Sequence, residues 1–147
     1  MTLEGFEELR FAPNWRDEDH NDFWSLVMSW NIKTNVELPL NVLQSNLENY
    51  FDGLMKPNHW AQEFPEPKAE FLESEQSKTE KTFTGKLTFF DGLHTGKVLT
   101  TYILGRQIFC EDTKKPIVIF KISSKAFNEP IWDKLNDINV KENICDD

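Results

Sequence analysis

Apolar residues recur at helical spacing in the middle of the N-terminal half of the chain. Leu40, Leu43, Leu47, Tyr50, Phe51 and Leu54 follow one another mostly in steps of three and four. This spacing places them on one side of a helix, and the intervening positions are polar. Pro39, together with a capping box of Asn41 and Gln44, would begin the helix, and Gly53 and Pro57 would end it. The pattern predicts a helix over about 40–54 that lies on a sheet.

An earlier segment, "DFWSLVMSWN", also has helical spacing. Phe23, Val27 and Trp30 stand at positions i, i+4 and i+7, which predicts a helix over about 20–30. The acidic and polar residues before it would cap its first turn, where free N–H groups favour side-chain oxygens and negative charge. The sequence therefore predicts two helices before any strand.

From Lys68 onward the hydrophobic pattern changes to alternation, which is typical of half-buried strands. Four segments show it: "KAEFLESEQS", "KTFTGKLTFF", "GKVLTTYILGRQIFCED" and "KPIVIFKISS". Gly105 lies inside the third and longest of them, which predicts a bulge or a sharp bend there. A short helix follows, with Asn128 as its cap and Ile131, Leu135 and Ile138 on one face.

The predicted order is helix, helix, four strands, helix, in a single domain of 147 residues. Helices grouped before a run of strands predict an α+β fold with a curved four-stranded antiparallel sheet, N-terminal helices packed on it and a short C-terminal helix. In element order and curvature this resembles the cone-shaped cystatin-like and nuclear-transport-factor-like folds. The resemblance is one of architecture and implies no function. Its core is expected where Phe83, Leu87, Phe89, Val118, Phe120 and Ile122 face Leu43, Leu47 and Phe51.

Composition and charge narrow the choice of partner. The chain has 25 acidic and 16 basic residues, a formal charge of −9, which repels phosphate backbones and anionic membranes. We expect no nucleic-acid or membrane partner. The start of the chain has no signal-peptide pattern and no stretch is long enough to span a membrane, so we expect a soluble cytoplasmic protein. Cys110 and Cys145 are too few for a disulfide framework, and the sequence does not decide whether they pair.

The stretch "FFDGLHTGK" offers the first candidate for chemistry. Asp91 and His94 stand three residues apart, and a carboxylate beside an imidazole is half of a general-base device. Asp91, Gly92 and Gly96 are also the residues that a tight reversal between two strands requires. No nucleophile accompanies the pair, so we expect a hairpin in which Asp91 and His94 are only weak catalytic candidates.

Other motifs for chemistry are scarce. "RDEDHND" is rich in acids but lacks the glycine and the distal glutamate of a calcium loop, and a helix start explains it more simply. Zinc, nucleotide and hydrolase signatures are missing, so we expect no metal and no cofactor. Cys110 alternates with Ile108 and is expected to be a buried, hydrophobic cysteine rather than a reactive thiol.

His59, Trp60 and Tyr102 are the candidates for lining a pocket, although large aromatic residues more often fill a core. The pattern as a whole favours a non-enzymatic module that binds a small apolar ligand or a protein, including a second copy of itself. One alternative is a small enzyme that uses Asp91 with His94 or His59 as acid and base. Another is an acidic protein that neutralises a basic protein partner.

Overall fold

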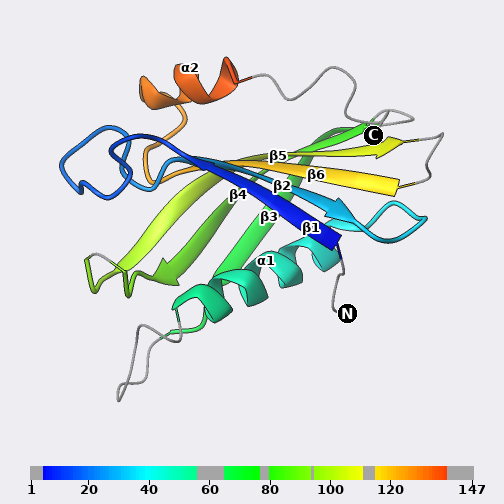
Figure 1. Ribbon diagram of the computed structural model, residues 1–147, viewed down its shortest axis with the longest axis horizontal. Helices are drawn as coiled ribbons and strands as arrows, with labels where there is room; N and C mark the ends of the chain where they lie inside the picture. Colours follow the sequence, from blue (N-terminus) through cyan, green and yellow to red (C-terminus); the bar gives the residue numbers. More distant parts are fainter. Residues whose placement is uncertain (1–4, 56–64, 77–79, 94, 111–114, 139–147) are drawn as a thin grey trace.

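The computed structural model describes residues 5–55, 65–76, 80–93, 95–110 and 115–138, and they form one antiparallel sheet with two helices (Figure 1). The elements are β1 (Gly5–Phe11), β2 (Leu26–Ile32), α1 (Leu40–Met55), β3 (Lys68–Gln76), β4 (Glu80–Phe90), β5 (Val98–Cys110), β6 (Lys115–Ser123) and α2 (Ile131–Asn136). The six strands lie in the order β1-β2-β6-β5-β4-β3. Figure 1 shows α1 and α2 on opposite sides of the sheet.

The predicted fold class, N-terminal helices packed on a cone-like four-stranded sheet, is wrong: the protein is mostly one six-stranded sheet. Residues 26–30 of the segment assigned to the first helix belong to β2, and residues 20–25 belong to the loop before it. The burial of β2 alternates along most of its length. Trp30 belongs to the apolar cluster on the α1 side of the sheet, whereas Val27 belongs to the cluster on the α2 side. Residues with apparent helical spacing therefore lie on opposite faces of a strand. A strand buried on both faces is a nearly continuous apolar run, and periodicity alone cannot distinguish it from a buried helix.

The sheet has six strands rather than four, because β1 joins β2 at its edge. The pairing runs from Gly5 opposite Ile32 to Phe11 opposite Leu26. The segment "GFEELRF" has charged residues at three of its seven positions, and an edge strand keeps much of its surface in water. Its alternation is therefore too weak to identify it from sequence.

The other elements are confirmed. The helix expected over about 40–54 is α1, the four alternating segments are β3 to β6, and the short C-terminal helix is α2. The expected core is also confirmed: its predicted members all belong to one buried cluster on the α1 side of the sheet. The predicted members are Leu43, Leu47, Phe51, Phe83, Leu87, Phe89, Val118, Phe120 and Ile122.

Both predicted helix caps are wrong. In α2 the residue at the N-cap is Pro130, and no side chain caps the helix. In α1 the amide oxygen of Gln44 accepts a hydrogen bond from the backbone N–H of Phe71 in β3 (3.1 Å) instead of turning back toward Asn41. One turn later, the carboxylate of Glu48 accepts from the N–H of Ala69 (2.8 Å). The polar side chains of α1 therefore bind the edge of β3.

Gly105 does not mark a bulge. It pairs with Phe83 on β4 and Phe120 on β6, and both ladders run through it without a shift in register. A register shift lies instead in β3, between Glu73 and Glu75. A Cβ atom on Gly105 would lie 2.2 Å from ring atoms of Phe83, so the glycine provides room for an aromatic ring of the neighbouring strand.

A second apolar cluster lies between the sheet and α2. Its buried members are Val27, Cys110, Ile117, Ile119, Ile131, Trp132 and Leu135. Cys110 is buried, as expected, and it is disulfide-bonded. The only other cysteine of the chain, Cys145, lies outside the described residues. The expected cytoplasmic location stays a prediction.

Among the described residues, neither helix is both long enough and apolar enough to cross a bilayer.

Candidate functional site

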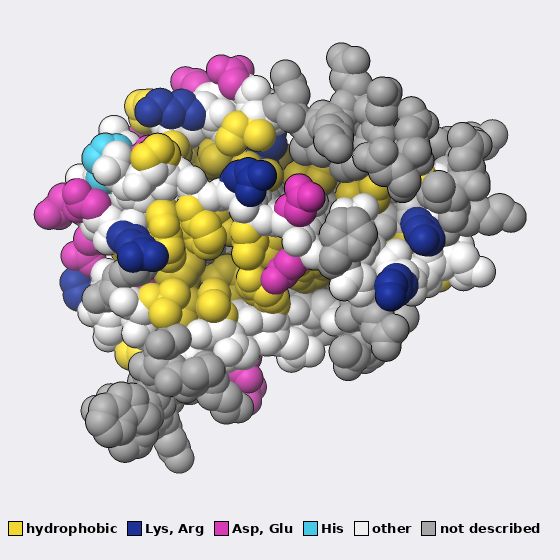
Figure 2. Space-filling model, viewed as in Figure 1, with side chains coloured by type: hydrophobic (Ala, Val, Ile, Leu, Met, Phe, Trp, Pro, Cys, Tyr) yellow, Lys and Arg dark blue, Asp and Glu magenta, His cyan; other side chains and the backbone are white. Residues whose placement is uncertain are grey.

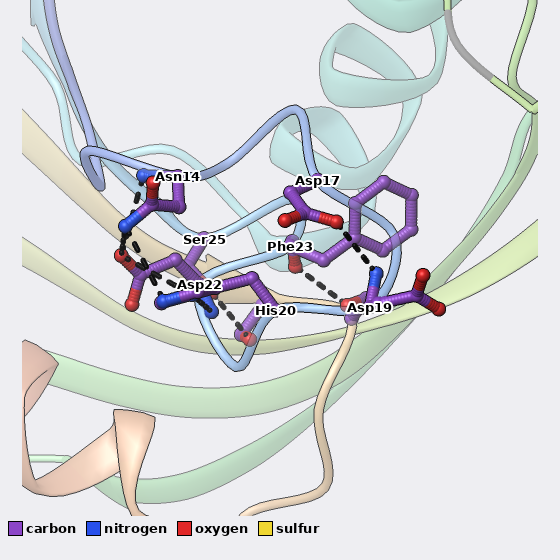
Figure 3. Close-up of polar contacts among 9 residues, drawn as sticks. Asn14, Asp17, Asp19, His20, Asp22, Phe23 and Ser25 are labelled. Carbon is purple, nitrogen blue, oxygen red and sulfur yellow. Dashed lines mark hydrogen bonds and ion pairs between the residues drawn. The ribbon is translucent and has the colours of Figure 1, made fainter.

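The loop of residues 12–25, which joins β1 to β2, contains a group of polar contacts (Figure 3). It is built from successive turns, each closed by a backbone hydrogen bond, and the bond from Ala12 N–H to the carbonyl of Ser25 (2.9 Å) closes its base. The side-chain hydroxyl of Ser25 lies 2.7 Å from that of Ser123 at the end of β6. The loop is thus fixed to the sheet at its base.

Asp22, His20 and Asn14 form the centre of this group. Asp22 is buried, and its Oδ2 accepts hydrogen bonds from the backbone N–H (3.3 Å) and the amide (3.5 Å) of Asn14. The N–H of Asp22 donates to Nδ1 of His20 (3.0 Å), and the amide nitrogen of Asn14 lies 3.3 Å from Nε2 of the same ring. The carboxylate of Asp22 lies 3.6 Å from Nδ1. These contacts hold His20 within the loop.

The acidic stretch of this loop begins no helix, so the predicted helix start is wrong. Asp17 Oδ1 instead accepts from the N–H of Asp19 (3.0 Å), a local turn contact of the kind that aspartate commonly makes. Glu18 lies 3.7 Å from Lys97, across the gap to the β4–β5 turn. No group of three metal-ligating side chains occurs in the part of the chain that the structure describes.

Trp24 connects the loop to the β4–β5 turn. Its φ of 52° is in the left-handed region, which is strained for a bulky side chain. Its N–H donates to the carbonyl of Trp15 (2.9 Å), and its indole Nε1 donates to the carboxylate of Asp91 (3.3 Å). The indole is almost completely buried. Burial and these two bonds together hold the unusual backbone conformation.

Asp91 is fully buried and organises the turn that follows β4. Its Oδ1 accepts from the N–H of Leu93 (3.0 Å), and its Oδ2 accepts from the N–H and the hydroxyl of Thr95 (both 3.0 Å) as well as from Trp24. β4 and β5 pair antiparallel on either side, from Phe90 opposite Val98 onward. His94, the other member of the predicted pair, lies outside the described residues. The carboxylate of Asp91 is thus engaged by donors from its own turn and from Trp24.

Asparagine is therefore a poor substitute at position 91. In Asp91→Asn an amide nitrogen, which is itself a donor, replaces one oxygen of the carboxylate. At least one of the buried donors that bind the carboxylate then loses its acceptor. We expect the free energy of unfolding of the variant to be roughly 1–3 kcal/mol lower than that of the parent. Chemical denaturation followed by tryptophan fluorescence measures this difference.

The matched control is Glu70→Gln, which removes the same charge from a side chain that is 69% exposed. We expect it to change stability by less than about 1 kcal/mol. Equal losses of stability in the two variants would show that the buried hydrogen bonds of Asp91 do not stabilise the protein.

Aromatic rings form a continuous series from the surface of this loop into the core. The ring of Phe11 stacks on Trp15 (centroids 4.2 Å apart), Trp15 meets Trp24 edge to face (5.1 Å), and Trp24 meets Phe89 edge to face (5.2 Å). Phe89 in turn contacts Phe51 of α1 (4.9 Å). We call these five residues the aromatic series. Phe11 is 40% exposed and Trp15 is half-buried, whereas the other three are buried.

The guanidinium of Arg16 lies over the Trp15 ring, 5.3 Å from its centroid. On α1, Tyr50 packs near Trp30 (6.3 Å). Burial, and then the negative charge of Glu7 on β1, raise the pKa of the Tyr50 hydroxyl above its usual value. Tyr50 therefore remains a neutral hydrogen-bond donor throughout the physiological range.

Of the three predicted pocket residues, the structure describes Tyr102 alone, so the predicted pocket stays a prediction. His59 and Trp60 lie outside the described residues. Tyr102 is half-buried on β5, where it packs near Phe127 (5.6 Å) and under the ammonium group of Lys86 (5.7 Å). It contacts the apolar cluster on the α2 side of the sheet, not the aromatic series. Phe11, Trp15 and Arg16 were not among the site residues predicted from the sequence. The adjacent pair Trp15-Arg16 was the only sequence feature that pointed to them.

Comparison with protein-family models, curated proteins and solved structures finds no match to this chain. Its function must therefore be inferred from its own residues.

Proposed function

We propose that the protein is a non-enzymatic binding module that takes a small apolar ligand at the exposed end of the aromatic series. The single observation that carries this proposal is the position of Phe11 and Trp15, which remain partly exposed while they stack on each other and contact a buried ring. Aromatic side chains commonly line ligand sites because they offer a large, rigid apolar surface. The rigidity here comes from the anchored loop.

The surrounding surface supports the same proposal. Figure 2 shows hydrophobic side chains gathered on the viewed face, over the part of the sheet framed by the loop of residues 12–25 and α1. Partly buried apolar residues that pack against the core cluster on the α1 side of the sheet include Leu9, Leu54 and Leu93. A contiguous apolar area of this kind commonly marks an interaction site on a soluble protein.

Arg16 adds a polar element to the site. Its cation lies over the outer tryptophan, so a ligand that contacts the exposed part of Phe11 and Trp15 would also meet a positive charge at the rim. Apolar sites generally take their orientation and selectivity from a few such polar groups. We therefore favour a flat apolar or aromatic ligand, neutral or with a single negative group.

Binding of a neutral, environment-sensitive dye such as Nile red tests the proposal. We expect saturable binding to the parent protein, with an affinity reduced about tenfold or more in Trp15→Ala, because removal of a central aromatic contact commonly costs 2 kcal/mol or more. The control is Leu72→Ala, which removes an apolar side chain that is 72% exposed on β3. Equal binding by the parent and the Trp15 variant would contradict the proposed site, provided that circular dichroism shows both to be folded.

A further inference from the structure

The two edges of the sheet differ in how their backbone groups are satisfied. On β3, the outward N–H groups of Ala69 and Phe71 donate to Glu48 and Gln44 of α1. The register shift between Glu73 and Glu75 interrupts the rest of that edge. Covering groups and bulges are common ways to stop an edge strand from pairing with another chain. The β3 edge is therefore covered at Ala69 and Phe71 and interrupted beyond Glu73.

Among the described residues, no further strand and no register shift closes the β1 edge. Ala12 N–H donates inward to Ser25, so by the alternation of an antiparallel ladder Arg10 and Glu8 also pair inward with β2. The N–H and C=O groups of Glu7, Leu9 and Phe11 then point outward. The position of Arg10 agrees, since its Nη1 reaches the outward carbonyl of Leu9 (3.3 Å). No strand among the described residues pairs with this side of β1, which Figure 1 shows at the margin of the sheet.

The charges along this edge are complementary to those of the same edge in a second copy of the chain. Glu8 and Arg10 lie on either side of Leu9, on the same face of the strand. A two-fold axis through Leu9 would place each Glu8 directly opposite Arg10 of a second copy. Opposite charges at facing positions of adjacent strands stabilise the pairing, and like charges destabilise it.

We propose that β1 pairs antiparallel with β1 of a second copy of this chain, across a two-fold axis at Leu9, to form one continuous sheet. The Leu9 residues of the two copies exchange both backbone hydrogen bonds, and Glu7 does the same with Phe11 of the other copy. Arg10 leaves the carbonyl of Leu9, which it contacts in the single chain, and binds Glu8 of the other copy. This inference goes beyond the proposed ligand binding and does not depend on it.

Other two-fold pairings of β1 with β1, in which the axis passes through a neighbouring residue instead of Leu9, are less favourable. An axis at Glu8 or at Glu7 places two carboxylates opposite each other, and an axis at Arg10 places two guanidinium groups opposite each other. An axis at Phe11 brings no opposite charges together and reaches Pro13, which has no N–H for a ladder. The charge pattern therefore favours Leu9 as the centre.

Charge reversal tests the proposal with the full chain. Sedimentation equilibrium should show a monomer–dimer equilibrium for the parent. Glu8→Arg and Arg10→Glu should each raise the dimer dissociation constant by roughly five- to a hundredfold, because each replaces two attractive pairs by two repulsive ones. The double variant, which restores the opposite charges in exchanged positions, should return to within about threefold of the parent. A matched control is Lys68→Glu, an exposed reversal on the β3 edge, which should leave the constant unchanged.

Amide hydrogen exchange gives a second, independent measurement. The N–H groups of Glu7, Leu9 and Phe11 should become more protected as protein concentration rises, whereas those of Glu8 and Arg10, bonded to β2, should be protected at every concentration. A protein that stays monomeric at millimolar concentration would overturn the proposal. So would a dimer that the single reversals do not weaken, since its interface would lie elsewhere.

Discussion

Replacing Gly105 with valine is expected to destabilise the protein by about 3 kcal/mol or more, although valine is the better strand former. A Cβ at this position would overlap the Phe83 ring at 2.2 Å, and the ring has little room to move because it is fully buried in the main cluster. Overpacking of a dense core typically costs 1–3 kcal/mol and sometimes more. The γ-methyl groups of valine add to the overlap. Urea denaturation of the parent and the variant gives the difference.

Gly53 provides the control for this substitution. It lies within α1, and a Cβ there would have no heavy atom within 4 Å. Gly53→Ala should therefore stabilise the protein by roughly 0.5–1 kcal/mol, the usual gain from replacing glycine within a helix. A Gly105→Val protein as stable as the parent would mean that Phe83 does not pack across the glycine as described.

Shortening Leu47 to alanine is the second substitution with a large expected effect. Leu47 is fully buried in the middle of α1, and the sheet residues that were predicted to face it belong to the same cluster. We expect the free energy of unfolding to fall by about 2–5 kcal/mol, because truncation removes apolar contacts and leaves a cavity. Thermal and chemical denaturation should agree on the loss.

Leu72→Ala serves again as the comparison, because Leu72 is 72% exposed on β3. Its truncation should change stability by no more than about 0.5 kcal/mol. If Leu47→Ala changed the stability as little as Leu72→Ala, α1 would not pack into the apolar cluster on its side of the sheet.

The sequence predicted α1 and β4 because the hydrophobic residues of each lie on a single face. Leu43, Leu47 and Phe51 repeat along one side of α1, and Phe83, Leu87 and Phe89 alternate along β4, so each pattern has one interpretation. In β2, Leu26, Met28, Trp30 and Ile32 alternate on the α1 side, while Val27 is buried on the other face. The added apolar residue lets the segment satisfy a helical and a strand pattern at once. β1 has the opposite difficulty, since an edge strand with charged positions shows little periodicity.

The candidate site was less predictable than the fold because its contacts join distant parts of the chain. Asp91 was recognised as a turn residue, but the bond from Trp24 crosses 67 positions and has no local signal. The stacking of Phe11 on Trp15 depends on the loop conformation, which was mistaken for the start of a helix. Gln44 fitted a capping box by spacing alone, and its role on β3 follows only from tertiary packing.

The strand order also determines how the chain must fold. β3, β4, β5 and β6 are neighbours in both sequence and space, so each pairing requires closure of only a short connection. The pairing of β2 with β6 joins Leu26 to Ile122 and encloses most of the chain in one loop. Closure entropy rises with loop length, and contacts between distant residues slow folding. The β1–β2 hairpin, with the exposed end of the aromatic series and the open edge, thus depends on the contact of highest sequence separation in the sheet.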